Sequence, residues 1–191
     1  MYSEYVEKLK AFSELAGGEF KYSNHPTTSL KRMGWSRVEI RIPHLKTDIF
    51  FIAFSGTNSA EVYSGFYAVA NLQENLICKI TQQDTFLSLI NKFSNKKMKS
   101  GRSSFDRKLS ITCNNKTFLL QLTRNHEIAK FLESYIQFPV QFEIVSNEKG
   151  FIKSCKQSKM LISINANEWI VDQKKLMSLL DGFKLVVDHI G

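Results

Sequence analysis

The chain has 191 residues, of which 43% are hydrophobic and 23% are charged, and its formal net charge is +8. This length and composition predict a single domain, 1–191, with a core of its own, and they exclude an intrinsically disordered protein. The longest apolar run, Ile49–Phe54, is too short to cross a bilayer. The opening residues, Met1–Lys8, are mixed in charge and do not match a signal peptide. We therefore expect a soluble, cytoplasmic protein without a transmembrane segment.

The N-terminal part of the chain predicts one helix followed by several strands. Apolar residues recur at helical spacing over 2–16, and Gly17-Gly18 ends this helix. A loop is expected at 24–36 because it carries His25-Pro26 and Gly34. The alternation of Val38, Ile40 and Ile42 with charged residues predicts a half-buried strand. The strands expected here are 19–23, 37–42, 49–54, 61–70 and 75–82.

Three further helices are expected in the rest of the chain, each starting at a residue that can cap it. They are 85–94 capped by Asp84, 124–136 capped by Thr123 and followed by Pro139, and 173–189 capped by Asp172. Asn114-Asn115-Lys116 predicts a hairpin turn, because Asn tolerates the left-handed region. The strands expected between these helices are 105–113, 117–122, 140–146, 150–154 and 159–165.

This order of elements predicts an α+β fold. Short turns favour antiparallel pairing, so we expect an antiparallel or mixed sheet with the helices mainly on one face. The N-terminal helix is followed by three rounds of strands and then a helix. No Pro-, Ser- or Gly-rich linker divides the chain, and the best position for a subdivision is the loop at 95–104.

Neither a metal nor a cofactor is predicted. Cys78, Cys113 and Cys155 show no CxxC spacing and fall in or beside expected strands, which indicates reduced structural thiols. The four histidines are scattered and lack metal-binding spacing. No glycine-rich phosphate loop of the P-loop or dinucleotide-binding type is present.

The segment 92–108 is strongly basic and carries one candidate site. Clustered Lys and Arg release counterions when they bind nucleic acid, and Ser and Gly amides can cradle a phosphate. Exposed aromatic residues for base stacking are missing, because Phe93 and Phe105 also fit core positions, so a solvated loop is the favoured interpretation. The candidate residues for binding nucleic acid or anionic lipid are Lys96, Lys97, Lys99, Arg102, Arg107 and Lys108.

A second candidate is a ligand or partner surface made by Trp35, Tyr63 and Tyr67. Alternation along a strand places Tyr63 and Tyr67 on one face and Phe66 on the other. Amphipathic rings favour interfaces, although core edges use Tyr and Trp in the same way.

No catalytic constellation is evident. Arg124, His126 and Glu127 follow Thr123 at an expected helix start, but no serine elbow accompanies them. An enzyme would need a site assembled from distant residues near strand ends. The residues considered for such a site are His44, Asp48, Glu61 and Asp106.

Three segments together resemble bacterial proteins of unknown function. These are the helix ending at Gly17-Gly18, the strand Val38–Ile42 and the Phe-Asp-basic run Phe105–Ile111, which precedes a polar hairpin and a leucine-bearing helix. The resemblance covers about residues 8–135 and implies a bacterial source and an α+β domain, but no functional residue.

The leading hypothesis is a non-enzymatic binding domain, whose partner could be another protein, with the sheet face or the basic loop as its contact surface. It follows from a well-formed core without a catalytic constellation. Polyanion binding and an enzyme with a dispersed site are the alternatives.

Overall fold

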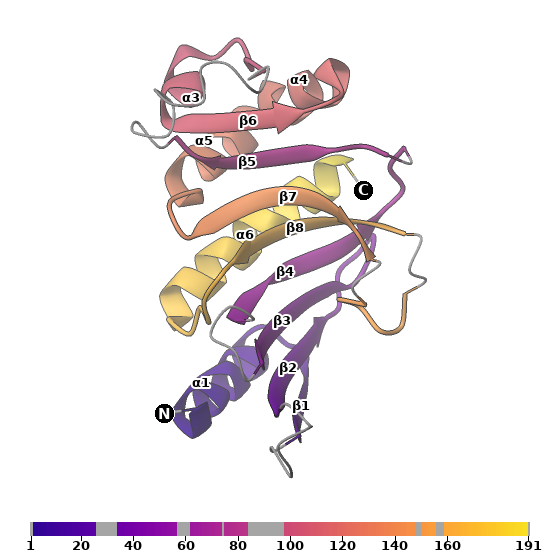
Figure 1. Ribbon diagram of the computed structural model, residues 1–191, viewed down its shortest axis with the longest axis vertical. Helices are drawn as coiled ribbons and strands as arrows, with labels where there is room; N and C mark the ends of the chain where they lie inside the picture. The colour runs from indigo at the N-terminus through magenta and orange to yellow at the C-terminus, as the bar shows by residue number, and fades with distance from the viewer. Residues whose placement is uncertain are drawn as a thin grey trace.

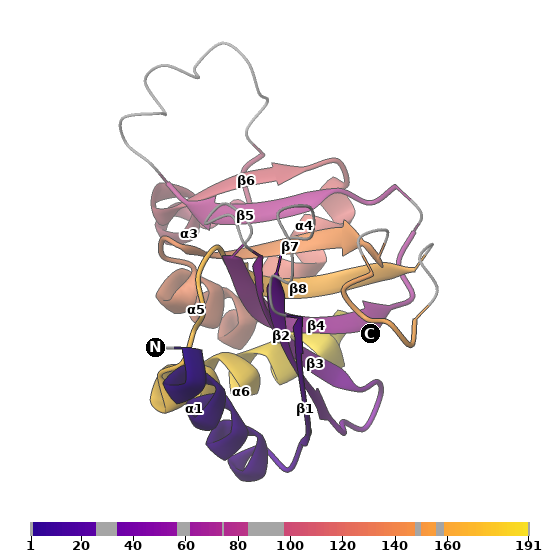
Figure 2. The ribbon, with the colours of Figure 1, turned by 60° about the horizontal axis from the view of Figure 1, so that its bottom comes forward.

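The structure is a computed structural model, and it describes residues 2–25, 34–56, 62–73, 75–83, 98–147, 150–155 and 159–190. These residues form five helices and eight strands (Figures 1 and 2). The helices are α1 (Tyr2–Leu15), α3 (Ser103–Lys108), α4 (Lys116–Arg124), α5 (His126–Tyr135) and α6 (Gln173–Ile190). The strands are β1 (Glu19–His25), β2 (Trp35–Ile42), β3 (Ile49–Gly56), β4 (Val62–Ala70), β5 (Cys78–Gln82), β6 (Leu109–Cys113), β7 (Val140–Ser146) and β8 (Met160–Ala166).

All eight strands belong to one sheet, in the order β1-β2-β3-β4-β8-β7-β5-β6. Every pair of neighbours is antiparallel. Strand β8 enters between β4 and β7, so the last strand of the chain joins the two halves of the sheet (Figure 1). The expected α+β fold is confirmed, and its sheet is antiparallel rather than mixed.

Strand β2 has the alternating burial that the sequence predicts for residues 37–42. In β2, Val38, Ile40 and Ile42 are buried, whereas Glu39 and Arg41 point to the other face and are more exposed. Strand β3 is buried on both faces, as expected for a strand in the interior of the sheet.

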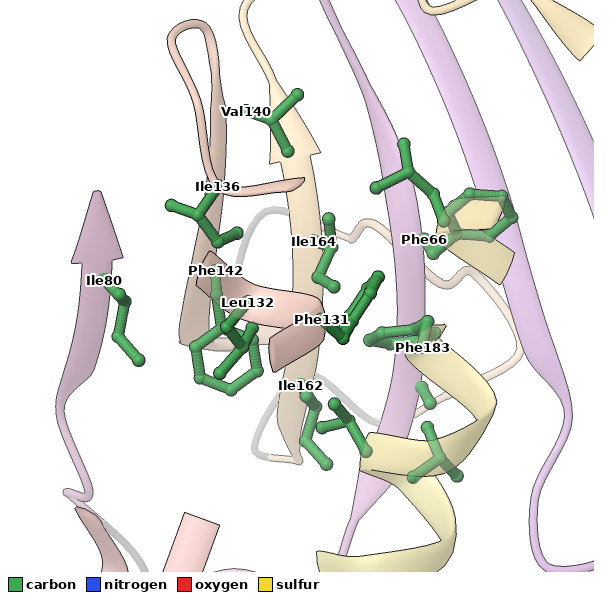
Figure 3. Close-up of a cluster of buried hydrophobic side chains, with 14 of the residues drawn as sticks. Phe66, Ile80, Phe131, Leu132, Ile136, Val140, Phe142, Ile162, Ile164 and Phe183 are labelled. Carbon is green, nitrogen blue, oxygen red and sulfur yellow. The ribbon is translucent and has the colours of Figure 1, made fainter. Parts of the chain in front are cut away.

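The main core lies between the sheet and the helices. It contains the buried residues of α1, α4, α5 and α6 and the residues of the strands that point toward them. In Figure 3, Phe131 of α5 lies beside Phe183 of α6, with Phe66 of β4 nearby. The rings of Phe66 and Phe183 are 6.1 Å apart between centroids. Burying one such ring stabilises the fold by about 1.5–3 kcal/mol, so this aromatic contact anchors the helix layer to the sheet.

The last helix also forms as expected. The Asp172 carboxylate accepts a hydrogen bond from the Lys175 amide at 2.7 Å, which satisfies an otherwise unpaired donor at the helix start. The apolar stripe from Leu176 to Val187 is buried.

The strand expected at 105–113 is wrong in its first part. Residues Ser103–Lys108 form α3, and only Leu109–Cys113 is a strand. The Asp106 carboxylate accepts hydrogen bonds from the Ser100 amide and hydroxyl, both at 2.8 Å, and the Asp106 amide donates to the Arg102 carbonyl. These bonds fix a helical turn where the residue pattern alone fits a strand. They also hold Ser100 in a buried position, so this part of the expected flexible loop is anchored.

The expected hairpin and second strand at 117–122 are also wrong. This segment is helix α4, whose buried side carries Phe118, Leu119 and Leu122. Asn115 does not form a hairpin turn but caps the helix, because its side chain accepts a hydrogen bond from the Phe118 amide at 3.0 Å.

Thr123 was expected to cap the helix that starts at residue 124, and this prediction is wrong. Thr123 lies inside α4, where its hydroxyl donates to the Leu119 carbonyl at 2.8 Å. Asn125 caps α5 instead, accepting hydrogen bonds from the Glu127 and Ile128 amides.

The strand expected at 150–154 is replaced by turns and bends in the structure. The expected helix 85–94 and its cap Asp84 lie outside the described residues. The three rounds of strands and helix hold in outline, since β1–β5, β6, and β7–β8 are each followed by a helix.

Candidate functional site

The sheet face that points away from the helices is divided into two chemically different halves. Over β3 and β4 this face is apolar and covered by a second, smaller cluster of buried residues. Over the neighbouring parts of β8, β7 and β5 it carries the polar side chains of Ser163, Asn165, Gln141, Glu143 and Lys79. We call it the open face, because no described helix packs on it.

The covered half of the open face lies under the segment 150–155. Ile152 is buried against Phe50, Ile52 and Leu161. The segment is held by Asn147, whose amide nitrogen donates to the carbonyls of Ile152 at 2.9 Å and Cys155 at 3.0 Å. The amide oxygen of Asn147 accepts from the Ile152 backbone amide at 3.0 Å.

A partly buried ion pair also contacts the same segment. The Arg37 guanidinium pairs with Glu39 at 2.9 Å and also donates to the Phe151 carbonyl. Arg37 is buried, and both partners are needed there because an unpaired buried charge is costly. The polar contacts of Arg37 and Asn147 therefore fix Phe151 in its position on the open face.

Aromatic rings form a continuous row across this half. The centroid distances are 6.2 Å for Trp35–Phe54, 5.3 Å for Phe54–Tyr63, 5.6 Å for Tyr63–Phe151 and 4.9 Å for Phe151–Tyr67. These separations suit stacked and edge-to-face contacts. Burial raises the pKa of Tyr67, so its hydroxyl stays protonated at neutral pH.

The polar half of the face is a ladder of side chains bonded to one another. Asn165 of β8 accepts a hydrogen bond from Gln141 and donates to Glu143, each at 2.9 Å. It also donates to the Ser163 hydroxyl at 2.9 Å. The Lys79 ammonium of β5 lies 3.5 Å from the other Glu143 oxygen. The ladder thus spans three neighbouring strands, and its side chains are held in one arrangement.

A groove lies where the aromatic row meets the polar ladder. Its volume is about 380 Å³, within the range of small-molecule sites. We call it the open-face groove, and its lining residues are Tyr63, Tyr67, Lys79, Gln141, Glu143, Phe151, Asn165 and Asn167.

A second hollow of about 350 Å³ continues toward the ends of β5 and β7. It shares Gln141 and Asn167 with the open-face groove. Its outer wall includes Phe138, whose side chain is 87% exposed. The polar lining of the open-face groove therefore continues into the second hollow, along Thr81, Gln82 and Gln83 of β5 and its end.

The structure brings the three predicted aromatic residues to one face. Trp35, Tyr63 and Tyr67 all belong to the aromatic row, and Tyr63 and Tyr67 line the groove. Phe66 points to the main core, as the alternation predicts. Trp35 lies farther along the row, with the Lys153 ammonium 5.8 Å from its ring centroid.

The residues that sequence reasoning missed are the polar ones, Gln141, Glu143 and Asn165. A usable signal was present, because polar residues alternate with buried apolar ones in both β7 and β8. These three side chains come together because β7 pairs with β8, where Gln141 lies opposite Asn165. The sequence alone does not specify which strands pair.

The basic candidate residues are only partly brought together. Lys96 and Lys97 lie outside the described residues. The Arg102 guanidinium donates to the Arg124 carbonyl at 3.1 Å, and Arg107 donates to the Ser103 carbonyl at 3.2 Å. Lys108 lies 4.0 Å from Glu133, and Lys99 is exposed.

The residues considered for a dispersed enzyme site do not converge. His44 is 2.8 Å from Asp188, Asp48 is 2.7 Å from Arg41, and Asp106 anchors Ser100; Glu61 lies outside the described residues. Within the described part of the chain, no group of His, Cys, Asp and Glu is suited to hold a metal ion.

Comparisons with protein-family models, curated proteins and solved structures found no match to this chain. Among the helices of the described residues, none has the length and apolar character needed to span a membrane.

Proposed function

We propose that the protein is a non-enzymatic binding protein whose ligand occupies the open-face groove. The observation that carries this proposal is the meeting of an ordered aromatic wall, Tyr63 and Phe151, with the bonded ladder of Gln141, Asn165 and Glu143. Sites for small ligands combine apolar and aromatic walls with a few fixed polar groups.

The charges in the groove indicate the class of ligand. Among the described residues that line the groove, Lys79 and Glu143 carry the charges, and these charges are opposite in sign. A polyanion would need an excess of positive charge, so the groove suits a neutral ligand. One apolar ring face would pack on Tyr63 and Phe151, while hydroxyl or amide groups at the ring edge would bond to the ladder. A sugar ring and a nucleoside both have this chemistry.

Ordered side chains favour binding because less conformational entropy is lost when the ligand arrives. Asn165 makes three hydrogen bonds to neighbouring side chains, and Phe151 is fixed by the backbone contacts of its segment. The groove therefore has its binding geometry before a ligand enters.

The first experiment records amide NMR spectra of the labelled protein with neutral saccharides and nucleosides added one at a time. We expect a binding compound to shift the signals of residues around Tyr63, Gln141 and Asn165. If no compound perturbs these signals at millimolar concentration, or if only polyanions do, the proposed ligand class is wrong.

The second experiment measures affinity for that compound by calorimetry. Tyr63→Ala and Glu143→Gln should each weaken binding by a factor of about 5 to 150, because loss of a contact residue costs about 1–3 kcal/mol. Tyr22→Ala is the matched control, since Tyr22 is 40% exposed and lies opposite Val38 of β2, which points to the helix side. Equal affinity in all four proteins would contradict the proposal.

Polyanion binding through Lys99, Arg102, Arg107 and Lys108 is the second candidate. It draws support from the hydrogen bond that Arg102 donates to the Arg124 carbonyl at 3.1 Å, because Arg124 adds a basic residue in the last turn of α4. It would appear as binding to RNA or anionic vesicles at about 50 mM salt that weakens steeply as salt is added. Arg107→Ala would then reduce affinity, whereas Tyr63→Ala would not.

A further inference from the structure

Two cysteines face each other on the neighbouring strands β5 and β6 at one end of the sheet. Cys78 of β5 lies directly opposite Cys113 of β6, and both side chains belong to the main core on the helix side. Both are free thiols in the structure. Among the described strands, β6 lies at the end of the sheet beside β5, so the two thiols lie at the junction between this outer strand and the rest of the sheet.

The hydrogen-bond pattern between β5 and β6 fixes the type of this pair. The Asn114 amide donates to the Ile77 carbonyl at 3.0 Å, and the Gln83 amide donates to the Lys108 carbonyl at 2.8 Å. Hydrogen-bonded pairs alternate with non-hydrogen-bonded pairs along an antiparallel ladder. Cys78 and Cys113 follow the pair of Ile77 and Asn114, so they form a non-hydrogen-bonded pair.

Non-hydrogen-bonded pairs bring side chains closer than hydrogen-bonded pairs. Their Cα atoms are about 4.5 Å apart, inside the window of about 4.4–6.8 Å that a disulfide spans. A bond between Cys78 and Cys113 therefore needs no large backbone movement.

The two thiols are chemically unequal. The interaction between the two thiols lowers the pKa of Cys113 and raises that of Cys78, and the Cys113 thiol also donates to the Asn115 carbonyl at 3.2 Å. Cys113 is also the more accessible, with 8% of its surface exposed against 1% for Cys78. It ends its strand beside the exposed residue Asn114. Since the thiolate is the attacking species, Cys113 is the nucleophile of the pair.

We propose that Cys78 and Cys113 are a redox-active pair that closes to an intramolecular cross-strand disulfide when it meets a small-molecule disulfide. The Cys113 thiolate attacks one sulfur of the reagent, forms a mixed disulfide and releases one thiol. Cys78 then loses its proton and attacks the Cys113 sulfur, which releases the second thiol. The protein is oxidised by two electrons, and one reagent disulfide is reduced to two thiols.

Closure would tie the edge strand β6 covalently to β5. The bond would lie on the helix side of the sheet, whereas Lys79, the residue after Cys78, faces the open-face groove. The cysteine pair is therefore separate from the proposed ligand site. A negative result for the disulfide would leave the binding proposal unchanged, and a negative binding result would leave the disulfide proposal unchanged.

The experiment treats the reduced, folded protein with oxidised glutathione, blocks remaining thiols with iodoacetamide and measures intact mass and peptides. We expect the mass loss of two hydrogen atoms, a single alkylated residue, Cys155, and a linked peptide joining Cys78 to Cys113. Dithiothreitol added before the alkylation step should restore all three free thiols. The variant Cys155→Ser should form the same bond, which excludes a bridge through Cys155.

The wild-type result alone decides the proposal, so a variant that fails to fold does not obscure it. Three alkylated cysteines after treatment would overturn it, as would a stable glutathione adduct on Cys113 or a bridge that uses Cys155. In Cys78→Ser, the pair cannot close, and Cys113 should retain glutathione as a mixed disulfide.

Discussion

Replacing Gly182 of α6 by alanine has two opposing effects on the free energy of unfolding: a gain in helix propensity and a steric overlap with Phe131. In an exposed helix interior, Gly→Ala is stabilising by about 1 kcal/mol. Here an added Cβ would lie 2.1 Å from two ring atoms of Phe131 and 2.5 Å from a third. Optimal carbon contacts are about 3.5–4.0 Å, so the ring would have to move by more than about 1 Å. Phe131 is only 7% exposed and packs in the main core, so its ring can move only by displacing other core residues.

Overpacking of a core costs about 1–3 kcal/mol, and an overlap this close belongs at the upper end. Subtracting the helix gain leaves a loss of about 2 kcal/mol, which lowers the Tm by about 4–8 °C for a chain of this length. Calorimetry measures this change in Tm. Asp181→Ala is the control: Asp181 is an exposed neighbour, so the stability of this variant should lie within about 0.5 kcal/mol of the wild type. Adding Phe131→Leu to Gly182→Ala should recover part of the expected additive loss, because the smaller side chain admits the methyl group. A rise in Tm for Gly182→Ala would refute the close packing of α5 on α6.

Three other outcomes follow from single residues. Asn147→Ala removes three hydrogen bonds from the segment 150–155, so the Ile152 amide should exchange faster, and urea unfolding should show a loss of about 1–3 kcal/mol. Asn125→Ala removes the cap of α5 and should cost about 1 kcal/mol in the same assay, whereas no loss is expected if another residue caps the helix. The pKa of Cys113 is lowered by its interaction with the Cys78 thiol, so its alkylation rate should rise with pH and reach half its plateau below the ordinary cysteine midpoint of about 8.5; Cys78→Ala should move that midpoint upward.

Elements with a single consistent periodicity could be predicted from the sequence. The alternation in β2 and the long stripe of α6 fit only one kind of structure, and both form as expected. The run Phe118–Leu122 is different, because its apolar residues fit a strand or a short helix equally well. The cap by Asn115 and the burial against the main core decide for the helix, and neither is visible locally.

The candidate site shows the same limit at a larger scale. The face on which Tyr63 and Tyr67 lie follows from alternation within one strand. The groove requires β8 to insert between β4 and β7, a pairing between segments far apart in the chain. The covering segment 150–155 could not be anticipated either, since its position depends on Asn147 and Arg37 rather than on any periodicity.

The polar ladder contributes little that the fold itself requires, and this supports a role in binding. Ser163 and Asn165 are 0% and 6% exposed in an interior strand, where apolar residues would stabilise the sheet at least as well. Room for the ladder also depends on Gly65 of β4, because a Cβ there would lie 2.5 Å from the Ile164 carbonyl oxygen and 2.6 Å from Asn165. Gly65 pairs with Asn165 between Tyr63 and Tyr67, at the junction of the aromatic row and the polar ladder. A small residue in the strand thus lets a buried amide lie against the sheet beside two tyrosines, and this arrangement supports the proposal that the groove binds a ligand.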